Sequence, residues 1–187
     1  AIVGESGSGK TTLVSLLQHI YPIQDGEIRI GSYQIKNLSN RSLRRYVGSV
    51  PQQIELFAGT IIENIALGDF NPDMQKITNI IEQLGLKEFI DRLPNGYNTI
   101  IGEHGTSLSG GERQRIAIAR IMYKDPMILI FAEATSSLDS ISERYVKKAL
   151  DSLSKQGKAI IVIAHRRSTV KTADNIVVLD QGKVAES

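Results

Sequence analysis

Gly4-Glu5-Ser6-Gly7-Ser8-Gly9-Lys10-Thr11 is the stretch that decides how this chain folds. It fits the pattern Gly-x4-Gly-Lys-[Ser/Thr], in which glycines let backbone N–H groups turn inward around a phosphate without a Cβ clash. The apolar residues 1–3 precede it, and Leu13, Leu16 and Leu17 follow at helical spacing. The sequence therefore predicts a phosphate-binding loop between a strand and a helix.

Lys10 and Thr11 provide the chemistry of this loop. The Lys10 ammonium is a mobile charge for β- and γ-phosphates, and the Thr11 hydroxyl is a ligand for the Mg²⁺ that accompanies them. The following helix directs the positive end of its dipole at the same place. A Gly/Ser-rich loop that only caps a helix is the alternative, and the Lys-Thr pair argues against it. The residues assigned to phosphate binding are Gly4, Glu5, Ser6, Gly7, Ser8, Gly9, Lys10, Thr11 and Thr12.

Composition is that of an ordinary globular domain. With 187 residues, of which 41% are hydrophobic and 22% charged, the chain is long enough to bury a core as one domain. The net charge of +2 gives no argument for a nucleic-acid or membrane surface. The absence of cysteine excludes disulfides and thiolate metal sites, and no apolar run reaches the length of a membrane span.

Hydrophobic patterns downstream of the loop alternate between helix and strand periodicity. Helices are expected over residues 10–20, 42–46 and 140–155. A half-exposed strand is expected over 26–31, paired with 33–35, and more buried strands over 47–50, 127–131, 158–164 and 175–179. Strands that alternate with helices predict a parallel sheet with right-handed crossovers.

Residues 59–92 show helical spacing with no strand between the helices, and a further helix is expected to begin near Ser109. We therefore expect a helical subdomain at about 59–123, inserted into a single domain whose core is 1–58 and 124–187. Both ends are expected to be truncated, because only three residues precede Gly4 and the chain stops within a predicted hairpin.

Five motifs in order resemble the nucleotide-binding domain of an ABC transporter, and the resemblance covers nearly all of the chain. After the phosphate loop, Val50-Pro51-Gln52 resembles the Q-loop and Leu108-Ser109-Gly110-Gly111-Glu112 the signature. Ala134 to Asp139 resembles the D-loop stretch and Ile163-Ala164-His165-Arg166 the H-switch. Residues 56–61 and 102–105 resemble the exporter-type domains of peptide, lipid and multidrug exporters.

The resemblance implies an α/β fold: a P-loop NTPase parallel-sheet core with a helical signature subdomain and a partial antiparallel β subdomain. It implies ATP and Mg²⁺ as ligands. Glu133 is implied as general base, His165 as its partner at the γ-phosphate, and Gln52 as the residue that senses Mg²⁺ and the attacking water.

The resemblance also implies two partners. One is a second nucleotide-binding domain in a head-to-tail dimer, where Ser109, Gly110, Gly111 and Glu112 of one subunit close over ATP on the other and Asp139 acts across the interface. The other is the transmembrane domain of the transporter, expected in the same full-length chain, with the nucleotide-binding domain at the cytoplasmic side of the plasma or inner membrane. Nucleic acid is not expected as a partner, because helical spacing spreads the arginines at 113, 115 and 120 and no aromatic residues interleave them.

Ala132 departs from the family pattern, because it stands where the Walker B aspartate belongs. Losing a carboxylate that orients Mg²⁺ is expected to impair hydrolysis while nucleotide binding survives in part. An engineered substitution is favoured over natural degeneration, since the remaining motifs are intact. Two other functions stay open: a catalytically silent ATP-binding regulatory domain, and a soluble ABC ATPase of repair or translation.

Overall fold

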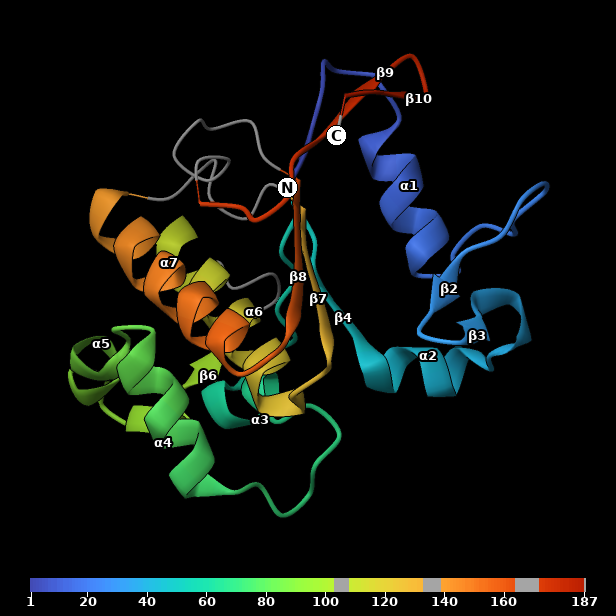
Figure 1. Cartoon of the computed structure of the whole chain (residues 1–187). Helices are drawn as coiled ribbons and strands as arrows, with labels where there is room; N and C mark the ends of the chain where they lie inside the picture. The colour runs from blue at the N-terminus through green and yellow to red at the C-terminus, as the bar shows by residue number, and fades with distance from the viewer. Residues whose placement is uncertain (103–107, 133–138, 164–171, 187) are drawn as a thin grey trace.

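A six-stranded sheet forms the centre of the computed structural model, which describes residues 1–102, 108–132, 139–163 and 172–186 (Figure 1). The strand order is β10-β9-β1-β8-β7-β4. Neighbouring strands from β9 to β4 run parallel, and β10 joins β9 antiparallel. The strands are β1 (Ile2–Val3), β4 (Val47–Val50), β7 (Ile128–Ala132), β8 (Ala159–Ile163), β9 (Val177–Asp180) and β10 (Lys183–Glu186). The predicted α/β fold with a parallel-sheet core is confirmed.

The two faces of the sheet pack against different helices. Leu129 and Phe131 belong to one buried apolar cluster, and Ile130, between them on β7, belongs to the other. Because side chains alternate along a strand, one continuous apolar run supplies both cores. Helix α1 lies over one face, and α6 and α7 lie over the other (Figure 1). The helices are α1 (Lys10–Leu17), α2 (Asn40–Tyr46), α3 (Ile61–Ile65), α4 (Met74–Gln83), α5 (Lys87–Asp91), α6 (Gly110–Lys124) and α7 (Ser140–Lys155), with 3₁₀ turns η1 (Ile35–Asn37) and η2 (Gly96–Asn98).

Helix α1 ends earlier than the predicted Ile20. Its last residue is Leu17, and His19 adopts a left-handed conformation with φ 55°. The His19 amide donates to the Leu16 carbonyl at 3.0 Å, so the chain closes into a turn instead of a further helical turn. The helix stop is therefore set by local hydrogen bonding before Pro22 is reached.

The segment that follows β4 contains strands, although none was predicted there. Strand β5 (Gly59–Thr60) pairs antiparallel with β6 (Ile100–Ile101). Two-residue strands have too few residues to show a periodicity, which is why the sequence pattern missed them. The larger apolar cluster continues from this segment to Leu129 and Phe131 of the sheet, and the division into subdomains stays a prediction.

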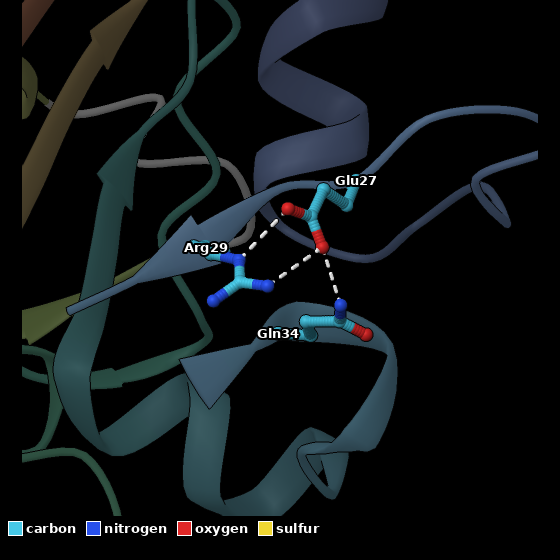
Figure 2. A network of polar contacts seen from close by, with 3 residues as sticks. All are labelled: Glu27, Arg29 and Gln34. Atoms are coloured by element: carbon cyan, nitrogen blue, oxygen red, sulfur yellow. Dashed lines mark hydrogen bonds and ion pairs between the residues drawn. The ribbon is translucent and has the colours of Figure 1, made fainter. Parts of the chain in front are cut away.

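A small hairpin stands apart from the main sheet. Strands β2 (Arg29–Ile30) and β3 (Tyr33–Gln34) pair antiparallel across the predicted turn, and the paired part is shorter than the expected 26–31. Figure 2 shows that the Glu27 carboxylate accepts from both Arg29, at 2.9 and 3.1 Å, and the Gln34 amide. These exposed contacts join the two arms and add little stability, because solvent screens them.

Among the described residues, none of the helices has both the length and the apolar character that crossing a membrane requires.

Asn64, a buried polar residue of α3, connects this helix to the chain between β4 and α3. Its side chain is 1% exposed; its Oδ1 accepts from the Phe57 amide at 2.9 Å, and its Nδ2 donates to the carbonyls of Phe57 and Thr60 at 3.0 and 3.1 Å. Arg120 also donates to Oδ1, at 3.0 Å. The side chain thus fixes the path of the chain between β4 and α3.

Asn64→Ala is expected to lower the free energy of unfolding by about 3 kcal/mol, because it leaves several buried backbone groups without partners. Chemical denaturation measures the change. Asn98→Ala is the matched control, since Asn98 is exposed, and its effect should stay within about 0.5 kcal/mol. Equal effects of the two substitutions would contradict the role assigned to Asn64.

Candidate functional site

The loop between β1 and α1 has backbone conformations that favour glycine. Gly4, Gly7 and Gly9 have φ values of 153°, 82° and 102°. At Gly4 an added Cβ would lie 2.2 Å from the Leu179 carbonyl oxygen and 2.6 Å from Ser8 Oγ. The glycine is therefore required by close packing against β9 as well as by its backbone conformation.

Lys10 places its ammonium group inside this loop. The residue is 6% exposed, and Nζ donates to the carbonyls of Gly4 and Glu5, each at 2.7 Å, and to Ser8 Oγ at 3.3 Å. Three hydrogen bonds offset the cost of burying this charge. The ammonium group is thus held inside the loop, where its positive charge would attract an anion bound by the loop amides.

The first turn of α1 has donors that the fold leaves available. Its N-cap, Gly9, has no side chain to accept from the first-turn amides, and the first backbone bond into the helix runs from Leu13 to Gly9 at 2.9 Å. Thr11 and Thr12 are exposed on this turn. A buried ammonium next to uncapped amides fits the phosphate groups of a nucleotide.

The last hairpin of the sheet supports the loop from outside. The Gly182 amide, in the turn between β9 and β10, donates to the Ser8 carbonyl at 3.0 Å. An added Cβ at Gly9 would be 3.5 Å from Gly182 Cα. The loop therefore lies against the C-terminal hairpin, although the two are far apart in the sequence.

Parallel topology brings the other predicted segments to the same edge of the sheet. In the register, Ile163 lies opposite both Ile2 of β1 and Ala132 of β7, and Val50 of β4 lies opposite Phe131 of β7. The carboxyl ends of β1, β8, β7 and β4 are therefore neighbours, and the edge where such ends meet is where α/β proteins bind ligands. Two predicted catalytic residues that follow these strands, Glu133 and His165, lie outside the described residues.

Gln52 and Ala132 occupy this edge. Gln52 is exposed in the bend after β4. Ala132 is the last residue of β7, and its half-buried methyl group packs against the apolar cluster on the α1 side. Among the described residues no three His, Cys, Asp or Glu side chains come together as a metal site. At position 132 this edge has no carboxylate that could hold Mg²⁺, and the metal-binding roles of Thr11 and Gln52 stay predictions.

The signature segment begins α6 with a capping box, in agreement with the helix start expected near Ser109. Ser109 Oγ accepts from the Glu112 amide at 3.2 Å, and Glu112 Oε2 accepts from the Ser109 amide at 2.8 Å. Ser109 and Gly110 are exposed and Gly111 is buried. At Gly111 an added Cβ would lie 2.9 Å from Ser142 Oγ and 3.1 Å from Asp139 Oδ2, so α6 and α7 begin side by side.

Asp139 is the N-cap of α7, a role that the sequence analysis did not assign. Its Oδ1 accepts from the amides of Ile141 and Ser142 at 3.0 and 2.9 Å, and its Oδ2 accepts from Ser142 Oγ at 2.7 Å. These bonds, chiefly those from Ser142, hold the pKa of the Asp139 carboxyl below its usual value. An aspartate just before a helical pattern is the signal that would have found this cap. Its action across a dimer interface stays a prediction.

Two arginines of α6 make structural contacts that the sequence pattern did not specify. Arg120 donates to the Asn64 carbonyl at 2.7 Å and to the Glu55 carbonyl at 3.2 Å, and its guanidinium lies 5.0 Å from the centre of the Phe57 ring. Arg115 donates to the carbonyls of Leu84 and Gly85.

A cavity of about 360 Å³ lies beside Arg120 and Phe57, next to the chain that follows Gln52.

Comparison with known proteins places this geometry in context. A family model described as "ABC transporter" matches residues 1–136. The chain is 50% identical over its whole length to an ATP-dependent lipid A-core flippase of Saccharophagus degradans, and it covers 32% of that protein. It is 49% identical, again over its whole length, to the human mitochondrial iron-sulfur clusters transporter ABCB7, of which it covers 25%.

A solved structure agrees with these sequence comparisons. A bacterial Atm1-family ABC exporter with ATP bound matches 99% of the chain with a TM-score of 0.92 and 43% identity. The chain covers 32% of that structure. It thus spans about a third or less of the proteins that it matches here.

Gly4→Ala is expected to destabilise the fold by at least about 3 kcal/mol, because the added methyl group meets the β9 backbone. Gly7→Ala is the matched control: Gly7 also has a positive φ, but nothing lies within 4 Å of its added Cβ, so the cost is about 1 kcal/mol. Thermal unfolding of both variants measures the difference. Similar losses would show that backbone conformation alone, without the contact to β9, requires the glycine.

Proposed function

This chain belongs to the ABC transporter family, and from that premise we propose that it is the ATP-hydrolysing motor domain of an ABC exporter. The observation that carries the proposal is the Lys10 ammonium, buried within a loop of left-handed glycines at the start of α1. This arrangement suits the triphosphate of a nucleotide better than it suits a neutral ligand. The exporter that matches the fold was solved with ATP bound.

In the proposed reaction, Lys10 exchanges its bonds to the carbonyls of Gly4 and Glu5 for bonds to phosphate oxygens. The loop amides and the first turn of α1 donate to the same phosphates, and Thr11 and Gln52 would hold Mg²⁺. When bound, the metal ion neutralises charge that develops on the transferring phosphoryl group. Glu133 accepts a proton from the water whose oxygen bonds to the γ-phosphorus, the bond from that phosphorus to the β–γ bridging oxygen breaks, and ADP leaves; His165 contacts the γ-phosphate.

The signature segment suits the second half of a head-to-tail dimer. The Ser109 hydroxyl and the amides of Gly110 and Gly111, which the capping box does not use, form a second donor group on a helix start. One chain needs a single γ-phosphate site, so we propose that this group closes over the nucleotide of a second nucleotide-binding domain. Asp139, which caps α7 next to Gly111, contributes to the same interface.

A transmembrane domain is the other proposed partner. The relatives named as a flippase and a transporter are three to four times longer than this chain, which leaves room for a membrane domain in such proteins. The cavity lined by Gln53 and Phe57 is a suitable place for the transmembrane domain to make contact. The chain that lines the cavity directly follows Gln52, so such a contact would be coupled to the proposed nucleotide site. In this arrangement the domain works at the cytoplasmic side of the membrane.

In this proposal, the alanine at position 132 lowers the rate of ATP hydrolysis. An aspartate there would orient Mg²⁺ by a charge-assisted hydrogen bond, which is worth roughly 1.5–3 kcal/mol. At about 1.4 kcal/mol per decade, its loss slows hydrolysis by about one to two decades. The same residue favours a second candidate function, a regulatory domain that binds ATP without hydrolysing it.

Lys10→Ala is expected to weaken ATP binding by roughly 10–100-fold, because charge-assisted hydrogen bonds to the phosphates are lost. Titration of a fluorescent ATP analogue measures this. Lys36→Ala is the control, because Lys36 is exposed on η1, and it should bind as the parent does. Unchanged affinity in Lys10→Ala would overturn the motor-domain proposal.

Ala132→Asp is expected to raise Mg²⁺-dependent ATP turnover by about one to two decades, since it restores the missing carboxylate. Ala132→Asn is the matched control, because it has nearly the same size without the charge, and its turnover should stay near that of the parent. Phosphate release measures both. ATP binding without any gain in turnover for Ala132→Asp would favour the silent regulatory domain.

A further inference from the structure

Arg115 joins the start of α6 to the end of α4. Its Nε donates to the Gly111 carbonyl at 3.2 Å, and its Nη1 donates to the carbonyls of Leu84 and Gly85 at 3.3 and 3.1 Å. The side chain is half-buried. One guanidinium therefore bridges two helix ends that are about 30 residues apart in the sequence.

Arg115 binds carbonyls at the C-terminal end of α4 that the hydrogen bonds closing this helix do not use. The Leu86 amide donates to Ile81 and the Gly85 amide donates to Glu82, with Gly85 at a φ of 62°. This is the Schellman arrangement, which satisfies the carbonyls one turn earlier. The carbonyls of Leu84 and Gly85 come after it, and both accept from Nη1 of Arg115, while Nε of the same planar guanidinium donates to Gly111.

The same place is packed tightly by α7. At Gly85 an added Cβ would lie 2.4 Å from the Tyr145 ring, and at Gly111 one would lie 2.9 Å from Ser142 Oγ. Burial lowers the pKa of Arg115, whereas the nearby charges of Asp139 and Glu112 raise it. The end of α4 and the starts of α6 and α7 therefore meet around this guanidinium.

We propose that Arg115 is a positioning residue for the signature turn, defined here as Ser109–Gly111. Its guanidinium holds the Gly111 carbonyl against the end of α4, so that the turn keeps one orientation toward the second subunit. Arg115 contacts the carbonyl of the buried Gly111, whereas Ser109 and Gly110 are exposed. Preorganised donors bind an anion more strongly than donors that must reorient. The inference rests on the proposed head-to-tail dimer.

The test separates nucleotide binding within one subunit from closure between two. In the full chain, Arg115→Met keeps much of the apolar stem and removes the guanidinium. Because Lys10 and its loop are untouched, affinity for ATP should stay within about twofold of the parent, while ATP-dependent self-association, followed by analytical ultracentrifugation, should weaken at least about tenfold. A purely structural role would lower both together or neither.

Arg92→Met is the matched control. Arg92 also donates from Nε to the carbonyl four residues earlier, Glu88, but it is exposed at the end of α5. It should leave both readouts unchanged. Arg115→Lys keeps the charge without the fork and should associate more strongly than Arg115→Met and more weakly than the parent.

Parent-like association of Arg115→Met, or a parallel loss of ATP affinity, would overturn the positioning role. If Arg115→Met does not fold, Arg115→Lys decides in the same way: weaker association with unchanged ATP affinity supports the role, and parent-like association overturns it. A parent that binds ATP without self-association would remove the dimer and this role together. A parent with no Lys10-dependent affinity for ATP would instead show that the proposed function has failed.

Discussion

The Lys10 ammonium must find hydrogen-bond acceptors inside the fold, and this requirement determines the shape of the loop between β1 and α1. The carbonyls of Gly4 and Glu5 supply them, each at 2.7 Å. They can do so only because the loop curls back on itself, which needs the glycine conformations at 4, 7 and 9. The same curl turns backbone amides toward the place where phosphate would lie. A buried charge and an anion site are thus two consequences of one loop shape.

The order and direction of the strands bring the other residues at the carboxyl edge of the sheet together. Parallel strands place all their carboxyl ends on one edge, so residues far apart in sequence, such as Gln52 and Ala132, come to neighbouring strand ends without any direct attraction. The helical part then adds a second donor group at Ser109, whose position depends on how α6 begins. Strand order therefore positions the first group, and contacts between helix ends position the second.

Features with a strong local pattern could be predicted from the sequence. The strand–loop–helix around Gly4 to Lys10, the parallel sheet and the start of α6 near Ser109 follow from glycine spacing and apolar runs. Features that depend on contacts distant in sequence could not. The clash that requires Gly4 involves Leu179, and the partners of Arg115 lie on another helix. The N-cap role of Asp139 has a local signal, an aspartate just before a helical pattern. The resemblance implies a different role for this residue, at the dimer interface.

The Gly182 amide that donates to Ser8 has a consequence for synthesis of the chain. Strand β1 is made before the other strands of the sheet, yet its two neighbours, β8 and β9, begin only at Ala159 and Val177. While the chain grows from the ribosome, β1 thus has neither sheet partner, and the loop after it lacks the hairpin that supports it. The loop after β1 therefore reaches the packing described here only once β9 and β10 have been synthesised.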